Sequence, residues 1–387
     1  MIKRYLFVLL ISLCPFAINA QLRLSDSAVI SLLTCEPVDD MAYTVYGHTA
    51  LRINDRVNGV DIVYNYGMFD FSSPNFLYRF AKGELNYKLG INEFADFLRE
   101  YAGRKSGVIE QILNLTKEEK QKISDALFIN CLPQNRTYLY NFLFDNCSTR
   151  PRILLEKNIA GKIEYPEILE QTTFRTIVHR ANKNHRWLTF GIDLALGAPL
   201  DNTIGQSLQL FIPEKLMRVF NHAKIIRANG SVENLVSETR KLAPSYPIGD
   251  KPLDSNPTVI LWLFFVFVLL LSFWERRRKC FRLFDFVLFF AYGLTGCLIF
   301  FLSFISIHPA VFPNFSMIWA HPLHLVLAVA LFIRPLKKFV KYYSLINGII
   351  LLLFVLGWNF FPQDFNAAFL PLILSLCVRS FTHIAAK

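Results

Sequence analysis

The last third of the chain constrains its fold most, because it contains five apolar runs in close succession. They begin just after Pro257 and cover residues 258–274, 286–305, 319–333, 345–358 and 365–378. Such runs are typical of helices that cross a bilayer whose hydrocarbon core is about 30 Å thick, although the later runs are short for that distance. A mean hydropathy of +0.33 also exceeds that of ordinary soluble proteins. We therefore expect an all-α membrane domain of five transmembrane helices over residues 258–387.

The charges between these runs predict how the membrane domain is oriented. Basic residues follow the first, third and fifth runs, at 276–279 and Arg282, at 334–341, and at Arg379 and Lys387, whereas the loops 306–318 and 359–364 contain no Lys or Arg. The positive-inside rule places basic loops in the cytoplasm. We therefore expect a multi-pass protein of the inner membrane, with its C-terminus in the cytoplasm and the region before residue 258 in the periplasm.

The first 20 residues have the pattern of a secretory signal peptide. Lys3 and Arg4 precede an apolar core of about ten residues, and the small Ala20 precedes Gln21. Ile18 is unusual three positions before a cleavage site, so an uncleaved signal anchor is the alternative. We divide the chain into a signal peptide (1–20), a periplasmic domain (21–242), a linker with four prolines (243–257) and the membrane domain (258–387).

Several function classes are disfavoured by the composition and the motifs. The basic loops explain much of the net charge of +11, so this charge does not indicate a nucleic-acid partner. The membrane runs carry almost no interior charge, with Asp285 at the cytoplasmic edge, which argues against a transporter. The sequence has no phosphate-binding loop, GxSxG elbow or zinc-type cysteine spacing. We therefore expect no cofactor and no metal.

The periplasmic domain has the mixed pattern of an α+β fold. A hairpin is predicted over 42–53 and 60–66, with Asn58-Gly59 in its turn. The segment 22–35 reads as helical or mixed. Thr116 and Glu119 form a capping box before a helix over 116–129. Further helices are expected over 168–181 and 213–222, and a second hairpin around Asn229-Gly230.

Cys147 is the best candidate for a nucleophile. It follows an aromatic run that breaks at Asp145-Asn146, and it precedes an expected helix that Asn146 or Ser148 can cap. The helix dipole, Arg150 and Arg152 all favour a thiolate there. A buried structural cysteine is the alternative for a lone thiol. In an oxidising compartment Cys35 and Cys131 can pair, which leaves Cys147 as the odd, reactive cysteine.

His48 is the best placed of the exported histidines to act as a base. It stands at the start of a strand, on the same face as Ala50 and Arg52, while Leu51 and Ile53 take the other face. The other exported histidines lie in polar helical surroundings typical of solvated surface residues: His179, His185 and His222. A Cys–His pair requires Cys147 and His48 to converge in space.

These residues carry a resemblance to known thiol enzymes. Gly47-His48-Thr49 before a hairpin, and Asn146-Cys147 before a helix, resemble the circularly permuted NlpC/P60 and lecithin:retinol-acyltransferase-like enzymes, which have a papain-like fold. More closely, LLTCEP (32–37), GHTALRIND (47–55), VYNYGMFDF (63–71) and FDNCSTR (144–150), followed by five membrane helices, resemble a Bacteroidota family of lipoprotein N-acyltransferases with an Lnb-type N-terminal periplasmic domain.

The resemblance implies Cys147 as nucleophile and His48 as base. Permuted relatives place a third, polar group on the strand after the histidine, which leaves Asp61, Tyr64 and Asn65. Strand alternation separates Tyr64 from Asn65 without choosing between them.

The resemblance also implies the two substrates, a membrane phospholipid as acyl donor and a diacylated lipoprotein as acceptor. Donor and acceptor both lie in the bilayer, so we expect substrate-binding groups on the outer side of the membrane domain as well as near the thiol. The candidates are Arg150, Asn146, His308, His321 and His324. For the three histidines, interfacial residues satisfied by water are the alternative. The competing functions are a peptidoglycan amidase or endopeptidase and a non-enzymatic sensor or scaffold, for which Cys147 would be dispensable.

Overall fold

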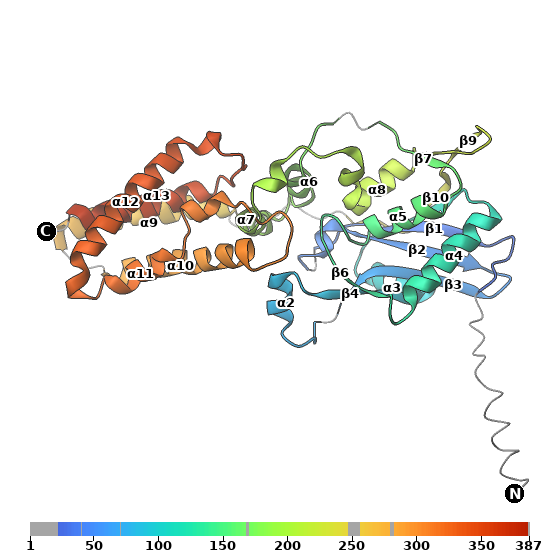
Figure 1. Cartoon of the computed structure of the whole chain (residues 1–387), viewed down its shortest axis with the longest axis horizontal. Helices are drawn as coiled ribbons and strands as arrows, with labels where there is room; N and C mark the ends of the chain where they lie inside the picture. The colour runs from blue at the N-terminus through green and yellow to red at the C-terminus, as the bar shows by residue number, and fades with distance from the viewer. Residues whose placement is uncertain are drawn as a thin grey trace, which may run out of the picture.

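The computed structural model of the chain describes residues 22–39, 41–69, 71–167, 170–246, 256–278 and 282–385. A domain built on β-sheet lies at one end and a helical domain at the other (Figure 1). The signal peptide predicted over 1–20 lies outside the described residues. So do most of the predicted linker and the basic residues Lys279 and Lys387.

A seven-stranded antiparallel sheet forms the centre of the N-terminal domain. Its strand order is β10-β5-β1-β2-β3-β4-β6. The strands span Val29–Cys35 (β1), His48–Asp55 (β2), Val60–Met68 (β3), Asn86–Glu93 (β4), Val108–Leu113 (β5), Thr137–Leu139 (β6) and Val236–Ala243 (β10). The hairpin predicted around Asn58-Gly59 is confirmed, since β2 and β3 pair on either side of it.

The helical or mixed interpretation of 22–35 was wrong, because β1 is a central strand. Its run VISLLTC is almost entirely buried. A short, continuous apolar run lacks the alternation that marks a half-buried strand, so periodicity alone cannot distinguish it from a buried helix.

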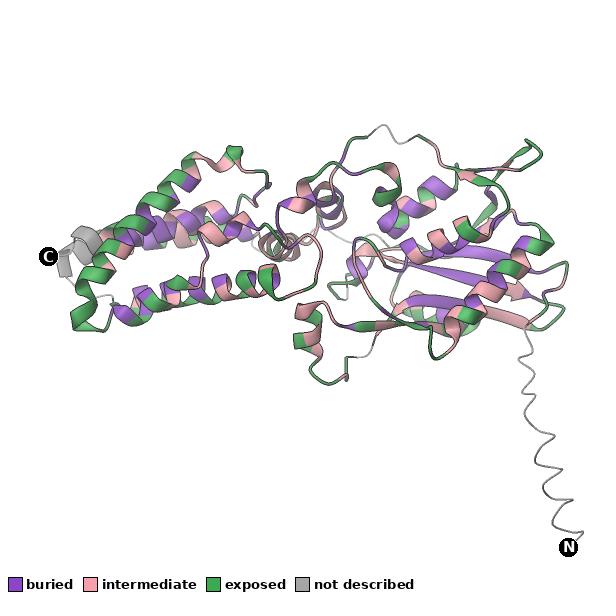
Figure 2. Cartoon of the chain, in the orientation of Figure 1, coloured by how far each residue is buried: buried purple, intermediate pink, exposed green. Residues whose placement is uncertain are grey.

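The two faces of the sheet have separate cores, and Figure 2 shows the buried strands behind more exposed helices. On one face Leu51, Ile53 and Tyr64 pack in a core with residues of α4 (Lys117–Cys131), α5 (Thr149–Asn158) and α8 (Pro213–Phe220). On the other, Cys35 and Ala50 pack with Phe97 of α3 (Phe94–Gly103). The predicted alternation along β2 is confirmed.

The possible pairing of Cys35 with Cys131 does not occur. Both thiols are free. Cys35 belongs to the core on the α3 face, whereas Cys131 packs against the core on the opposite face. A disulfide needs Cα atoms about 4.4–6.8 Å apart, and these two side chains pack on opposite faces of the sheet.

Most other predicted elements of this domain are present. The capping box of Thr116 and Glu119 starts α4 as expected. The helix predicted over 168–181 is shorter, as α6 (Phe174–Ala181), and Ile168 and Leu169 lie outside the described residues. The helix predicted over 213–222 is α8. The second hairpin joins β8 (Lys224–Ile226) to β9 (Val232–Asn234), beside β7 (Lys162–Glu164), and α7 spans Arg186–Ala195.

The helical domain contains α9 (Pro257–Arg278), α10 (Arg282–Phe304), α11 (Leu323–Ala330), α12 (Lys337–Leu356) and α13 (Phe369–Ala385). Three stretches are long and apolar enough to cross a membrane: Pro257–Trp274, Arg282–Phe304 and Arg334–Leu356. The other two apolar stretches are shorter, Phe315–Ala330 and Phe369–Thr382. The expectation of five spanning helices is therefore met in part.

Arg379 corrects the prediction that the membrane helices carry almost no interior charge. Its guanidinium is fully buried and forms two short hydrogen bonds with the carboxylate of Asp285, at 2.6 and 2.7 Å. It also donates to Ser272 Oγ at 3.0 Å. Asp285 is equally buried, although it lies in the first turn of α10, and Arg379 is not a surface marker of topology. The pair joins α9, α10 and α13, and removing one partner would leave the other charge buried and unpaired.

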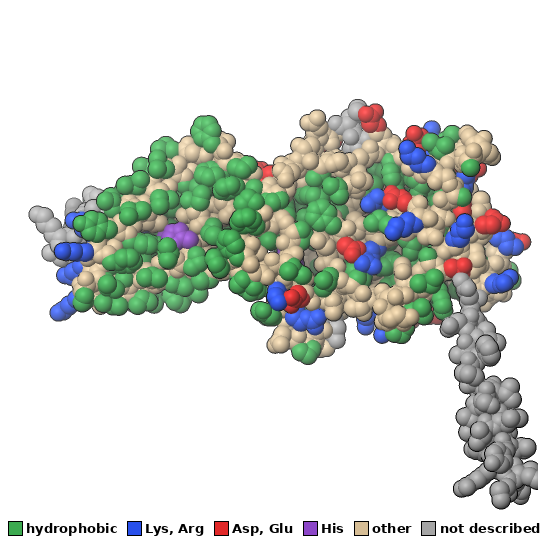
Figure 3. Space-filling view, in the orientation of Figure 1, with side chains coloured by type: hydrophobic (Ala, Val, Ile, Leu, Met, Phe, Trp, Pro, Cys, Tyr) green, Lys and Arg blue, Asp and Glu red, His purple; other side chains and the backbone are tan. Residues whose placement is uncertain are grey.

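The two domains meet through the loops that lack Lys and Arg. The Ile307 N–H donates to Lys82 O, at the end of α2 (Phe76–Lys82), at 2.9 Å, and Asn314 Nδ2 donates to Leu194 O at 2.9 Å. Asn366 Nδ2 donates to the buried carboxylate of Asp193 at 2.8 Å. The C-terminus lies at the far end of the helical domain (Figure 1). Hydrophobic side chains cover most of this domain, and basic side chains gather at its far end (Figure 3).

Candidate active site

Cys147 lies in the turn immediately before α5. The expected helix begins two residues later, at Thr149. Of the two predicted caps, Ser148 holds the N-cap position but its side chain makes no capping hydrogen bond. Asn146 Oδ1 instead accepts the backbone N–H groups of Ser148 and Thr149 at 2.8 and 2.9 Å. The Asn146 amide also donates to two carbonyls, Phe142 O at 2.7 Å and Phe211 O at 2.9 Å. Asn146 therefore fixes the turn that carries the thiol.

His48 is the first residue of β2, and Gly47 determines how the chain reaches it. Gly47 has a φ of +74°, and a Cβ atom there would lie 2.5 Å from the Cys35 carbonyl oxygen. Only glycine tolerates this close approach in this backbone conformation. The register of β1 and β2 then sets His48 directly opposite Cys35.

The thiol and the imidazole favour each other's charged forms. Burial alone would raise the pKa of Cys147, but the charge and hydrogen bond of His48, with hydrogen bonds from the Thr49 backbone and the Ser148 hydroxyl, lower that pKa below its usual value. Burial alone would lower the pKa of His48, but the Cys147 thiolate and the hydrogen bond of Asn65 raise it. The arrangement favours a thiolate–imidazolium pair.

Asn65 is the polar residue of β3 that reaches His48. His48 Nε2 donates to Asn65 Oδ1 at 2.9 Å, and Asn65 Nδ2 donates to Asn92 Oδ1 at 2.7 Å, which orients the Asn65 amide. Tyr64 lies in the core on the opposite face of the sheet. Asp61 is held by Arg52 in a bidentate ion pair at 2.7 Å. The geometry therefore brings Asn65, and neither Tyr64 nor Asp61, to the imidazole.

Two further residues enclose the site, and neither was singled out from the sequence. The ring of Tyr101, on α3, lies parallel to the His48 imidazole, with ring centroids 6.0 Å apart. Gly67 has a φ of +94°, and a Cβ atom there would lie 3.9 Å from Cys147 Cβ. Gly67 falls where the β3–β4 pairing is irregular. A glycine inside a strand pattern often marks such a close approach, so the sequence contained a signal for Gly67 but none for Tyr101.

Arg150 and Asn146 were both predicted to bind substrate. In the structure, side-chain N–H groups of both residues donate hydrogen bonds to other groups of the protein. The Arg150 guanidinium donates twice to the Asp145 carboxylate, at 2.6 and 2.7 Å, and lies 3.4 Å from the centroid of the Tyr138 ring. Asn146 holds the turn. These contacts orient both side chains within the protein, and substrate binding by Arg150 or Asn146 stays a prediction.

Family models match both domains. One described as the Lnb N-terminal periplasmic domain matches residues 18–180, and one described as the Lnb transmembrane domain matches residues 250–387. The chain belongs to the Lnb family. It is therefore a membrane protein with an N-terminal periplasmic domain, and that domain contains both Cys147 and His48. No curated protein and no solved structure matches the chain.

The histidines of the Lnb transmembrane domain do not join the periplasmic site. His321 and His324 are stacked, with ring centroids 3.9 Å apart, and His324 is fully buried. His324 Nδ1 lies 2.9 Å from Tyr343 Oη, and Nε2 lies 3.1 Å from Trp319 O. His324 therefore packs between helices, and a substrate-binding role for it stays a prediction. His308 does lie on an outer loop, where Nε2 donates to Phe80 O at 2.7 Å.

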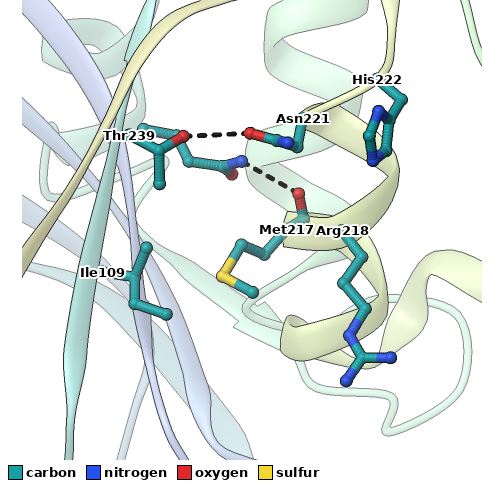
Figure 4. Close-up of a pocket in the computed structure, with 7 residues that line it drawn as sticks. Ile109, Met217, Arg218, Asn221, His222 and Thr239 are labelled. Atoms are coloured by element: carbon teal, nitrogen blue, oxygen red, sulfur yellow. Dashed lines mark hydrogen bonds between the residues drawn. The ribbon is translucent and has the colours of Figure 1, made fainter.

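A separate pocket of about 400 Å³ lies between α8 and the edge of the Lnb periplasmic sheet, as Figure 4 shows. Its polar groups bond one another: Gln111 Nε2 donates to Met217 O at 3.0 Å, and Thr239 Oγ1 donates to Asn221 Oδ1 at 3.0 Å. Its lining includes neither Cys147 nor His48. Within the described parts of the chain, no group of three or more His, Cys, Asp or Glu residues could hold a metal ion.

Proposed function

We propose that this chain is a lipoprotein N-acyltransferase. It moves an acyl chain from a phospholipid, through a thioester on Cys147, to the α-amine of the S-diacylglyceryl cysteine of a lipoprotein. The observation that carries the proposal is the contact of Cys147 with His48 and of His48 with Asn65, in a domain joined to the outer loops of a membrane domain. A thiol, a base and a group that orients the base are what covalent acyl transfer requires.

In the first half-reaction the Cys147 thiolate attacks the acyl carbonyl carbon of the phospholipid. A C–S bond forms and the C–O ester bond breaks. The His48 imidazolium gives its proton to the departing alkoxide, so lysophospholipid leaves as a neutral alcohol. Asn65 keeps the imidazole oriented toward the thiol throughout.

An oxyanion forms on the acyl oxygen during this attack, and the Cys147 backbone N–H is the donor we assign to it. The neighbouring backbone amides, at the start of α5, are those of Ser148 and Thr149. The N–H groups of Ser148 and Thr149, however, are taken by Asn146. Among the described residues the Cys147 N–H has no acceptor, so it is free to stabilise the oxyanion.

In the second half-reaction the lipoprotein amine attacks the thioester. His48, now neutral, accepts a proton from the amine nitrogen, a C–N bond forms and the C–S bond breaks. This restores the thiolate–imidazolium pair. The net change converts an ester and an amine into an amide and an alcohol, which is favourable because the amide is the more stable product.

We also propose that the periplasmic domain has a circularly permuted papain-like fold. In support, the histidine precedes the cysteine in the chain, on a sheet strand that faces the start of a helix. For the orientation we propose an inner-membrane protein with a cytoplasmic C-terminus. In support, the loops without Lys or Arg contact the periplasmic domain, while basic residues gather at the opposite end (Figure 3).

The experiment that tests the function is mass spectrometry of the N-terminal lipopeptide of a reporter lipoprotein. Cells carrying only Cys147→Ala should accumulate the diacylated form, whereas the native chain should give the triacylated form. Cys131→Ala is the matched control, since it removes a free thiol from the same domain on the other face of the sheet. Unchanged triacylation in Cys147→Ala cells, with the protein at its normal level, would refute the proposal. Altered peptidoglycan fragments in those cells would then favour an amidase.

A further inference from the structure

The short helix α2 exposes apolar side chains on the periplasmic domain. Leu77 is 79% exposed, Tyr78 54% and Phe80 52%. Large apolar side chains that cluster on a surface generally mark a contact with a membrane or another molecule. These residues do not belong to the core of the periplasmic domain, because no residue of α2 is buried.

Helix α2 lies against the outer end of the membrane domain (Figure 1). The His308 imidazole donates to Phe80 O at 2.7 Å, and the ring centroids of Tyr78 and Phe301 are 6.1 Å apart. The neighbouring end of α10 and the loop after it also expose apolar side chains: Phe300, Phe304, Ile305 and Ile307. The apolar surface of α2 therefore continues the surface that the membrane domain presents to lipid.

A row of aromatic rings leads from α2 toward the thiol. Ring centroids are 6.2 Å apart between Phe76 and Phe69, 5.0 Å between Phe69 and Tyr87, and 4.3 Å between Tyr87 and Tyr140. Tyr140 in turn lies beside Gly67, the residue that approaches Cys147. We call Phe76, Phe69, Tyr87 and Tyr140 the aromatic row. All four residues are half-buried.

We propose that α2 and the aromatic row bind the acyl chain of the donor phospholipid and guide it from the bilayer to Cys147. This inference rests on the proposed function and names the route of its first substrate. Rings without formal charge provide apolar contact over the whole distance, and Tyr is a residue that suits the boundary between lipid and water.

A lipid fits this surface better than a protein partner does. The surface begins beside the outer ends of membrane helices, where a phospholipid is always present, and it leads to the thiol that would react with the ester. The charged side chains of α2 stand at its end: Lys82 pairs with Glu84 at 2.7 Å, and Arg79 donates to Glu84 O at 3.1 Å. A short helix with an apolar face and basic residues is typical of a segment at the membrane surface.

The test is photo-crosslinking of the full chain in phosphatidylethanolamine vesicles that contain a phospholipid with a diazirine in its acyl chain. Cys147→Ala is used as the parent, so the readout does not depend on chemistry. We expect adducts on the peptides that contain the aromatic row. Adding Leu77→Glu and Phe80→Glu should lower their yield about tenfold, because charged side chains are unfavourable in lipid. The control is Val57→Glu, which adds a charge at a 73% exposed apolar residue in the β2–β3 turn.

Adducts confined to α9–α13, or an unchanged yield in the Leu77/Phe80 variant, would overturn the inference. The proposed function is judged separately, by whether the native chain forms an acyl-enzyme on Cys147 in the same vesicles. In a chain that retains Cys147, the Leu77/Phe80 variant should lose that acyl-enzyme about tenfold while reacting normally with water-soluble iodoacetamide. A parallel loss of iodoacetamide reactivity would show that the substitutions disturb the site itself, and would also overturn the inference.

Discussion

The molecule contains two groups of polar side chains that look alike in composition and differ in arrangement. The periplasmic group joins Cys147, His48 and Asn65, and each contact favours a charged thiol or imidazole. The membrane group joins His321, His324 and Tyr343, and both ring nitrogens of His324 have partners within the helix packing. The difference teaches that a site is recognised by contacts that favour a reactive charge on the thiol or the imidazole, since the presence of histidines alone does not define one.

Of the substitutions that distinguish the two groups of polar side chains, that of His48 should have the largest effect on the rate of acylation. Without the imidazole, Cys147 loses both its base and the positive charge that stabilises its thiolate. His48→Asn should slow formation of the acyl-enzyme by ~10²–10⁴-fold. Intact-protein mass spectrometry of the purified chain in phospholipid vesicles, sampled over time, measures this rate. His222→Asn is the control, since it changes a histidine of the same domain outside the site. A His48 variant that acylates at the native rate would exclude this residue as the base.

A smaller effect should follow from Asn65, which orients the imidazole through one hydrogen bond at 2.9 Å. Asn65→Ala should slow acylation by about 10–10²-fold, the range that corresponds to loss of a hydrogen bond to a charged group. The kinetic constant to follow is the single-turnover rate at saturating phospholipid, together with its pH dependence, since a merely structural defect would not shift the profile. Tyr64→Phe is the matched control on the same strand. If Tyr64→Phe were the more damaging change, the assignment of the third group would have to be reversed.

The pH dependence of thiol alkylation compares Cys147 with a second cysteine of the same chain. The pKa of Cys147 is lowered below the ordinary 9.0 by His48, whereas burial raises the pKa of Cys131 to about 11. A lowered pKa means that the thiolate is present below pH 9.0 and is lost as the pH falls through that pKa. Iodoacetamide at pH 7.5 should therefore label Cys147 well before Cys131.

His48→Asn should remove this advantage and move the midpoint of Cys147 alkylation to higher pH. Peptide mapping of the labelled chain after different times gives both rates in one sample. Equal labelling of Cys147 and Cys131 in the native chain would show that the thiolate is not stabilised, and the comparison between the two polar groups would then fail.

The sequence identified the pair at the centre of the site because few exported residues can act as nucleophile or base. Cys147 and His48 are 99 positions apart, so their contact had to be inferred from resemblance rather than from spacing. Asn65 could have been chosen over Tyr64 from the sequence. The Asn58-Gly59 turn sets Leu51 opposite Tyr64, and directly opposed residues share a face. Leu51 was already assigned to the face opposite His48, so the hairpin register would have excluded Tyr64.

Other features depended on tertiary contacts that no local pattern records. β1 was misread because it is buried on both faces, and Arg379 was misread because its partner Asp285 lies on another helix. Tyr101 stacks on His48 from a helix whose sequence suggests only an amphipathic surface element. The sequence therefore predicts best the residues with rare chemistry, and least well the residues that enclose and orient them.

Substitution of the membrane histidines should have the smallest effect on activity. This effect decides whether the periplasmic and membrane groups of polar side chains differ in function. His324→Ala removes two buried hydrogen-bonding atoms and leaves Tyr343 Oη and Trp319 O without this partner. It should destabilise the helical domain by ~1–3 kcal/mol, seen as a lower midpoint of thermal aggregation in detergent. Because His324 has no contact with Cys147 or His48, thiol alkylation should be unchanged. A variant with native stability that nevertheless fails to acylate lipoprotein would contradict a purely structural role for these histidines. It would make the stacked histidines a second functional site inside the membrane domain.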